Sequence, residues 1–361
     1  MSFINTIGTA TAPYKMNQMD IAAFMQNFYS IDEKDKRRIQ LMYEKSGIET
    51  RYSAIPDYGA QANERELLPF DLKNNFPSVN KRMDVFFKVA PQMCKTAILN
   101  CLESPNELNT ITHLITVSCT GMAAPGLDLI LLEELQLPNS TNRTSVNFMG
   151  CYAAFHALKI ANAICKADAD SKVLIVSVEL CTLHFQKHYS MDNVAANLLF
   201  ADGAAACILS GKALHKNVIE LNRFYSEVMF DGKKDMAWHI NENGFLMTLS
   251  AFIPQLIESG ISKMLHKLLK LAQLNISDID NWAIHPGGRK IIESIQKELQ
   301  LSNTQVSASY DVLKHYGNMS SATILFVLQK MMYEKRSGNV FACGFGPGLT
   351  LETCIGKFIS Q

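Results

Sequence analysis

Residues 147–154 are Asn-Phe-Met-Gly-Cys-Tyr-Ala-Ala, and this stretch joins an extended segment to an Ala-rich helical one. The helical pattern runs from Cys151 to Cys165, and the next apolar run, residues 172–179, is typical of a buried strand. A helix set between two strands in this way is the repeating unit of a sheet that contains parallel strands and is covered by helices. The stretch therefore predicts an α/β fold and places Cys151 where a strand gives way to a helix.

The same alternation continues on both sides of this stretch. Further strands are predicted at residues 113–118, 203–210, 282–285, 340–343 and 349–356. Further helices are predicted at residues 125–137, 194–200, 253–274, 288–299 and 321–334. The first hundred residues are predicted to be mainly helical, with Asp20 and Asp32 as helix caps. The order of elements repeats, so we predict two similar units, 1–215 and 216–361, packed as one body.

The composition excludes several classes of protein. Of the 361 residues, 48% are hydrophobic and 19% are charged, which is typical of a chain with a packed core. Lys plus Arg and Asp plus Glu both number 34, so the basic surplus of a nucleic-acid-binding protein is missing. No apolar run reaches the roughly 18 residues of a membrane span, and residues 1–15 do not resemble a signal peptide. We therefore expect a soluble cytoplasmic protein that binds neither nucleic acid nor membranes.

The nine cysteines do not form a recognisable disulfide or metal pattern. Their number is odd, no pair has CxxC spacing and no two histidines have HExxH spacing, so no metal is expected. A buried cysteine is usually only a small apolar side chain. Cys151 differs because a helix N-terminus stabilises a thiolate, and Gly150 allows a substrate to approach closely. From this segment alone, a nucleophile and a buried cysteine in a helix cap are about equally supported.

Two other segments each place a polar residue next to a predicted strand or helix. His285 closes a predicted strand and is followed by Pro-Gly-Gly at 286–288, at the edge where open α/β sheets bind ligands. Asn318 lies in Tyr-Gly-Asn-Met-Ser-Ser-Ala at 316–322, just before a helical pattern. Taken singly, the histidine is most simply a structural residue and the asparagine a helix N-cap.

Together, these three segments resemble the catalytic motifs of type III polyketide synthases, the chalcone and stilbene synthase family, in a bacterial-type member. Phe-Ala-Asp-Gly-Ala-Ala-Ala at 200–206 and Gly-Phe-Gly-Pro-Gly-Leu-Thr-Leu-Glu at 344–352 resemble two further family motifs. All five have the family's order and spacing, over about residues 20–357. The resemblance implies a thiolase fold, with two similar βαβαβαββ halves in five αβαβα layers, and a homodimer. It also implies that no metal or redox cofactor is needed.

The implied reaction is acyl transfer followed by decarboxylating condensation. Cys151 as a thiolate, paired with His285 as an imidazolium, would take a starter acyl group from an acyl-CoA. Malonyl-CoA would then lose CO₂, and His285 with the Asn318 amide would stabilise the enolate that attacks the thioester. Repeated condensation would give a polyketide, for example of the alkylpyrone or alkylresorcinol type. An acyl carrier protein is an alternative source of the starter.

Two other functions stay open at this point. A ketoacyl-ACP synthase of the third type shares the fold and the Cys-His-Asn set, but its histidine motif is typically His-Gln-Ala-Asn. A non-catalytic thiolase-fold partner subunit would have lost the cysteine or the histidine, and both are present here.

The resemblance also assigns residues around the substrate. Around the substrate it implies Phe185 and Met247 as gatekeepers, and Ser320 as a further pocket residue. Four pocket positions differ from the usual family residue: Cys119 and Cys181 replace threonines, and His184 and Trp238 replace small residues. Ala124 replaces a methionine that, in the family, enters the cavity of the partner subunit. The residues assigned to CoA are Lys45, Arg51, Arg289 and Lys290, for which a solvated surface charge is the alternative. Cys119 favours an apolar tunnel and a medium- or long-chain starter, whereas Trp238 and His184 favour a narrowed cavity.

Overall fold

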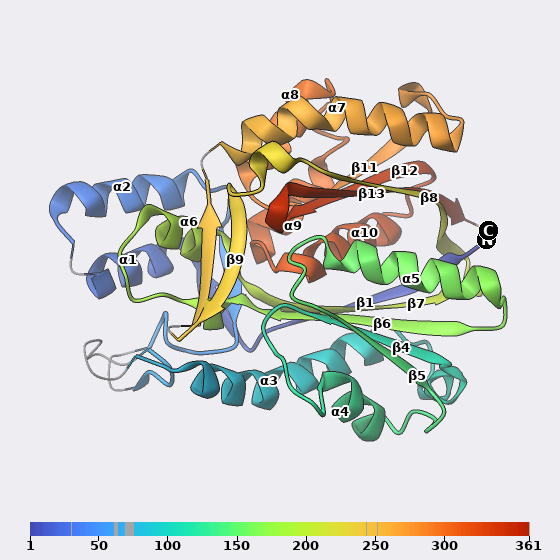
Figure 1. Ribbon diagram of the computed structural model, residues 1–361, viewed down its shortest axis with the longest axis horizontal. Coiled ribbons are helices and arrows are strands. Elements are labelled where there is room, and N and C mark those ends of the chain that lie inside the picture. The colour runs from blue at the N-terminus through green and yellow to red at the C-terminus, as the bar shows by residue number, and fades with distance from the viewer. Residues whose placement is uncertain (30, 61–63, 69–75, 243, 251, 361) are drawn as a thin grey trace.

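The computed structural model describes residues 1–29, 31–60, 64–68, 76–242, 244–250 and 252–360, and a mixed sheet of nine strands runs through its centre (Figure 1). The strand order is β11-β12-β13-β8-β1-β7-β6-β4-β5. The strands are β1 (Phe3–Thr11), β4 (His113–Ser118), β5 (Asn142–Asn147), β6 (Lys172–Leu180), β7 (Asp202–Ser210), β8 (Asn217–Val228), β11 (Ile279–Ile284), β12 (Gly338–Gly346) and β13 (Thr350–Ser360).

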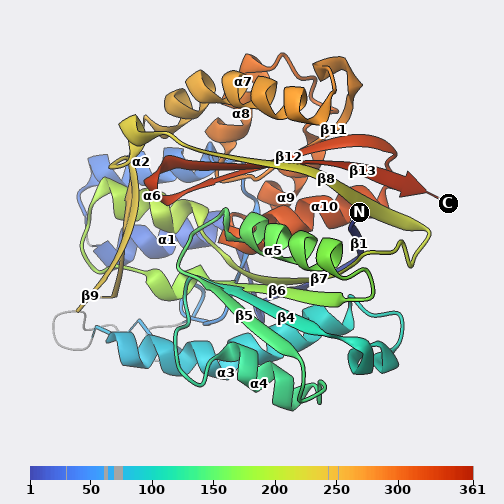
Figure 2. The same ribbon diagram turned by 45° about the vertical axis from the view of Figure 1, so that its right-hand side comes forward.

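The sheet has two parts that meet only at one end of β1. This strand pairs along its length with β7, but with β8 only at Phe3 and Ile4. Beyond that point the two parts separate into layers, and α5 (Ala153–Ala167) and α10 (Thr323–Tyr333) lie between them (Figure 2). The helices α3 (Val79–Leu99) and α4 (Leu127–Glu134) cover one outer face, and α7 (Ile253–Ala272) and α8 (Arg289–Glu298) cover the other.

Three groups of buried apolar side chains fill the spaces between these five layers. One lies between α3, α4 and the first part of the sheet, one surrounds α5 and α10, and one lies under α7 and α8. The predicted five-layered α/β arrangement is therefore confirmed. The strand predicted at 113–118 agrees with β4 residue for residue, because its apolar side chains are buried on both faces of the sheet. None of the helices in the described part of the chain has the length and apolar character to cross a bilayer.

The first hundred residues are mainly helical, as predicted, but they also contain three strands that the sequence patterns missed. β1 lies in the middle of the sheet, and β2 (Tyr14–Asn17) and β3 (Thr50–Ser53) form a small ribbon before and after α1 (Gln18–Tyr29) and α2 (Glu33–Glu44). Asp32 is the N-cap of α2, as predicted, and accepts a hydrogen bond from the Asp35 N–H at 2.8 Å. Asp20 is not a cap, because α1 begins two residues before it.

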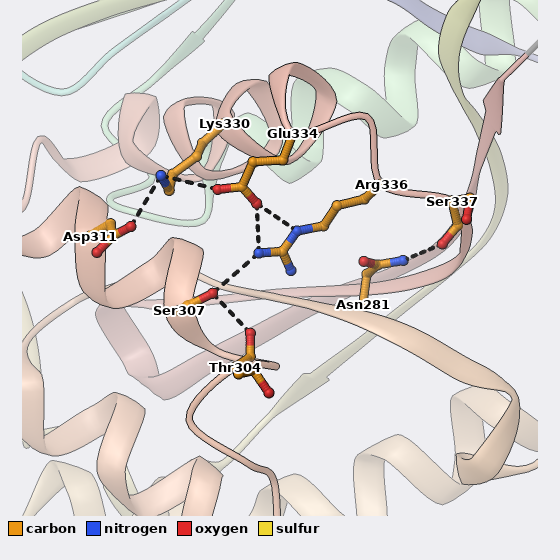
Figure 3. Close-up of polar contacts among 8 residues, drawn as sticks. All are labelled: Asn281, Thr304, Ser307, Asp311, Lys330, Glu334, Arg336 and Ser337. Atoms are coloured by element: carbon orange, nitrogen blue, oxygen red, sulfur yellow. Dashed lines mark hydrogen bonds and ion pairs between the residues drawn. The ribbon is translucent and has the colours of Figure 1, made fainter.

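The remaining elements surround the site described below. They are α6 (Met191–Leu199), the hairpin of β9 (Met236–Asn241) and β10 (Gly244–Leu249), and α9 (Ser307–Tyr316). The sequence patterns did not identify α9, β8 or the hairpin as separate elements. A polar network holds α9 against α10 (Figure 3): Lys330 bonds to Asp311 at 3.0 Å and to Glu334 at 3.1 Å. Arg336 joins Glu334 to Ser307. This network fixes the two helices whose connecting turn carries Asn318.

Candidate active site

Cys151 lies in the turn between β5 and α5. The turn needs glycine at position 150, because its φ is +82° and an added Cβ would lie 2.3 Å from Pro347 Cδ. The Gly150 N–H donates to the Cys119 Sγ at 3.0 Å, and this bond ties the turn to the segment that follows β4. The first helical residue of α5 is Ala153, so Cys151 precedes the helix N-terminus, as the sequence predicted.

His285 and Asn318 come from the second half of the chain and lie beside this turn. His285 follows β11, and its ring is buried with no hydrogen-bond partner for either nitrogen among the described residues. Asn318 is fixed on both sides of its amide: Nδ2 donates to the Gly287 carbonyl at 3.2 Å, and Oδ1 accepts from the Ser320 N–H at 2.9 Å. Cys151 Sγ lies 4.0 Å from Asn318 Oδ1.

The Asn318 side chain does not cap a helix. The caps of the following helical turns are Met319 and Ala322. The Asn318 backbone pairs with residues at the end of α6, donating to the Leu199 carbonyl and accepting from the Ala201 N–H, both at 2.9 Å. The N-cap explanation is therefore wrong. The two backbone hydrogen bonds instead hold residue 318 in place, so that its side-chain amide lies next to Cys151.

Burial favours the neutral form of both reactive groups. Burial raises the pKa of the Cys151 thiol to about 12, although the neighbouring Ser320 and Asn318 side chains act to lower it. Burial also lowers the pKa of His285 to about 3.

A buried carboxyl group lies beneath the cysteine. Glu179, at the end of β6, accepts from the Cys119 N–H at 2.9 Å and from the Ser321 hydroxyl. It thereby links the segment that supports Gly150 to the turn that carries Asn318. Burial raises the pKa of Glu179 to about 7. No sequence motif singled out Glu179; the available signal was a charged side chain at the end of a mainly apolar strand.

Glu179→Gln is expected to remove part of the pH dependence of stability. Between the usual pKa of 4.5 and about 7, the folded chain keeps a proton on Glu179 that the unfolded chain has released, so folding stability falls as the pH rises through this range. The glutamine side chain can still accept the hydrogen bond from the Cys119 backbone N–H, and it does not titrate. Urea unfolding should therefore show the variant gaining stability relative to wild type between about pH 5 and pH 8. A difference that is constant with pH would contradict this role.

The three residues Cys151, His285 and Asn318 line one cavity of about 640 Å³. Its apolar walls come from α6, the β9–β10 hairpin and the start of α7: Met191, Leu198, Leu199, Met236, Met247, Leu249, Ile253 and Pro254. Lys45, Arg289 and Lys290 also line it and are exposed, so the expected basic entrance lies at this cavity. Arg38 belongs to the same set and was missed. It lies seven residues before Lys45, which places both near one face of α2.

Arg51 is not part of that entrance. Its side chain is only 4% exposed, and its guanidinium donates to the Phe200 carbonyl. Burial lowers the pKa of this group, while Tyr43, Tyr58 and Asp202 stabilise its charge. The assignment of Arg51 to CoA is therefore wrong, because the fold uses it inside the protein.

A second, smaller chamber of about 30 Å³ lies behind the first cavity. The two share Phe200, Trp238 and Met247 as walls. Cys181 and His184 line the smaller chamber, together with Arg51, Thr182, Gln186, Asn193 and Asn197. The structure thus brings Cys181, His184, Trp238 and Met247 together around the smaller chamber.

Phe185 and Cys119 lie elsewhere. The Phe185 ring packs among Phe28, Tyr29 and other core aromatic rings and lines neither cavity formed by the described residues. Phe200, for which the sequence motifs gave no pocket role, lines both cavities. Cys119 is fully buried and also lines neither cavity, so its thiol supports the nucleophile turn rather than a tunnel wall.

Ser320 and Ala124 complete the assigned residues. Ser320 is fully buried with a left-handed φ of +47°, and its side chain acts to lower the pKa of the Cys151 thiol. Ala124 is exposed in the segment after Cys119 and lines neither of these two cavities. Among the described residues, no three His, Cys, Asp or Glu side chains gather in a way that could hold a metal ion.

A cysteine, a histidine and an asparagine that meet between the two parts of a five-layered α/β fold define a thiolase-fold condensing enzyme. The family model for the N-terminal domain of chalcone and stilbene synthases matches residues 1–213, and that for the C-terminal domain matches residues 220–360. The chain therefore belongs to the chalcone and stilbene synthase family, the type III polyketide synthases, which make polyketides by condensation.

Relatives of known name and structure agree with this. The chain is 32% identical to "Alpha-pyrone synthesis polyketide synthase-like Pks18" of Mycobacterium tuberculosis, over 98% of this chain and 90% of the relative. The C-terminal type III polyketide synthase domain of Steely1 from Dictyostelium superposes with a TM-score of 0.91 at 27% identity, covering 99% of both chains. PKS-I of the brown alga Ectocarpus siliculosus superposes with a TM-score of 0.89 at 29% identity, covering 99% of this chain and 98% of that one. The predicted thiolase fold is confirmed.

Proposed function

We propose that the protein is an acyltransferase that loads a starter acyl group from an acyl-CoA onto Cys151 and extends it repeatedly with malonyl-CoA. The observation that carries this proposal is the convergence of Cys151, His285 and Asn318 on one large cavity with apolar walls and a basic rim. The rim suits the phosphates of CoA, and the walls suit an acyl chain.

Loading begins from the neutral pair. As a thioester enters and displaces water, the Cys151 thiol transfers its proton to His285, and the thiolate attacks the thioester carbon. The CoA thiolate leaves and takes up a proton, and the acyl group stays on Cys151. Because burial opposes both charges, the proton transfer is favoured only when the attack immediately consumes the thiolate.

Extension uses the same histidine with Asn318. When malonyl-CoA loses CO₂, the electrons of the broken C–C bond pass into an enolate whose oxygen needs donors. The Asn318 amide gives one N–H to Gly287, which leaves its second N–H for the enolate, and His285 supplies the other donor. The enolate carbon then attacks the Cys151 thioester, the Cys151 thiolate leaves, and the chain on CoA is two carbons longer.

The shape of the cavity points to a medium- or long-chain starter. This expectation now depends on the walls formed by α6, the hairpin and α7, because Cys119 does not reach the cavity. A cyclised product of the α-pyrone type is the simplest, since the relative from Mycobacterium tuberculosis is named for alpha-pyrone synthesis. Mass spectrometry of products from purified protein, malonyl-CoA and a panel of acyl-CoA starters tests the proposal directly.

The starter preference should rise with chain length. Each buried CH₂ adds about 0.8 kcal/mol, so kcat/KM should grow roughly fourfold per methylene from acetyl-CoA until the cavity is full. Leu249→Trp should shorten the preferred starter, because Leu249 lines the cavity. Leu271→Trp, on the exposed surface of α7, is the matched control and should change nothing. A steady fall in kcat/KM with length would reject the apolar site and indicate that Trp238 acts as a plug.

Other properties are part of the same proposal. The two halves are the units 1–215 and 216–361, and the enzyme acts in the cytoplasm without a bound cofactor, taking its starter from CoA rather than from a carrier protein. A homodimer is supported by β5, which forms an edge of the sheet and exposes Asn142, Arg143, Thr144 and Ser145. An edge strand of this kind is suited to pairing with a second copy.

A further inference from the structure

His184 is a polar side chain in the wall of the smaller chamber and has no part in the reaction described above. It ends a short 3₁₀ turn, Cys181–His184, that follows β6. Its ring lies between Trp238 and Phe245, with centroid distances of 4.7 and 4.3 Å. Its Nε2 lies 2.9 Å from the Thr120 hydroxyl. The ring therefore has one fixed orientation in the wall of the smaller chamber.

The Thr120 hydroxyl determines which ring nitrogen carries the proton. Thr120 is fully buried, and its oxygen accepts from the Leu180 N–H at 3.3 Å. In the described part of the chain, His184 Nε2 is the acceptor available for the hydroxyl hydrogen, so Nε2 must be unprotonated. Burial holds the pKa of His184 well below its usual value, so the ring is neutral and the proton is on Nδ1.

The Nδ1–H has no acceptor among the described residues of the chain. The chamber that His184 lines shares the Phe200, Trp238 and Met247 walls with the cavity of Cys151. A space of about 30 Å³ holds one or two waters or a carbonyl group, but not a ring. A β-keto chain attached to Cys151 carries carbonyl oxygens, and these accept hydrogen bonds from a neutral N–H.

We propose that His184 determines product specificity: its Nδ1–H binds a carbonyl oxygen of the β-keto chain on Cys151 and so fixes how the chain folds before it cyclises. This inference rests on the proposed polyketide synthase reaction. The Thr120 hydroxyl is a positioning group, because it selects the tautomer without reaching the chain.

The test compares the products of variants that keep or remove this donor. His184→Asn places an amide N–H near the position of Nδ1 and should keep the wild-type ratio of cyclised to linear products. His184→Phe fills the space between the two aromatic rings without a donor, and His184→Gln places its amide near Nε2. Both should change the ratio by about tenfold, as expected for a lost hydrogen bond. Wild-type ratios in His184→Phe would overturn the proposal.

Thr120 provides a second test if a substitution at His184 prevents folding. Thr120→Val should shift the product ratio in the same direction as His184→Phe, whereas Thr120→Ser should not. In wild type, two-bond ¹H–¹⁵N spectra, assigned by the signal lost in His184→Asn, should show His184 protonated at Nδ1; protonation at Nε2 would overturn the proposal. If wild type makes no polyketide from any starter, the proposed function fails. If it does and these ratios do not move, only the role of His184 fails.

Discussion

Cys151→Ala is expected to stop polyketide formation while malonyl-CoA is still decarboxylated. The variant has no thiol to hold the acyl chain, but it keeps His285 and Asn318, which stabilise the enolate. Loss of a catalytic nucleophile costs on the order of 10⁶ in rate, so product should fall below detection. Release of CO₂ from labelled malonyl-CoA and mass spectrometry of the products measure the two activities separately.

Acylation provides the direct control for this prediction. After incubation with an acyl-CoA, peptide mapping should find the acyl adduct on Cys151 of wild type and on no peptide of the alanine variant. Cys165→Ala, in the buried face of α5, is a matched control and should keep the adduct at Cys151. An adduct on Cys119 or Cys181 would overturn the mechanism, since both thiols lie near the nucleophile.

Asn318→Ala is expected to lose both activities together, by about 10² to 10³ in rate. The amide is held by Gly287 and Ser320 so that one N–H is left for the enolate, and alanine removes that donor. Asn318→Asp tests the donor more specifically. Its carboxylate still accepts from the Ser320 N–H, and only the N–H donor of the amide is lost. Its decarboxylation should be at least as slow as that of the alanine variant.

Normal decarboxylation in Asn318→Ala would show that this side chain only holds the turn between α9 and α10. Unfolding curves would then separate the two roles. A structural residue lowers the stability and leaves kcat per folded molecule unchanged, whereas a donor to the enolate lowers kcat in protein that is fully folded.

The sequence by itself determined the alternation of strands and helices and the place of Cys151 at a strand-to-helix turn. These features depend on local rules. Apolar periodicity predicts β4 and β6 because their side chains are buried in the sheet, and the turn before α5 needs Gly150 for its positive φ. β1 was missed because it lies far from its partner β7 in the chain, and pairing over that distance leaves no local signal.

Only the tertiary structure decided which side chains reach the substrate. Phe185 and Phe200 are both apolar aromatic residues in similar local settings, yet one packs among core rings and the other lines the cavity. Arg51 and Lys45 lie six residues apart, yet one is buried against Phe200 and the other is exposed at the entrance. The cavity is formed by segments that are distant in the chain, from α2 to β12. Whether a residue faces it depends on how those segments pack, which no single stretch of sequence specifies.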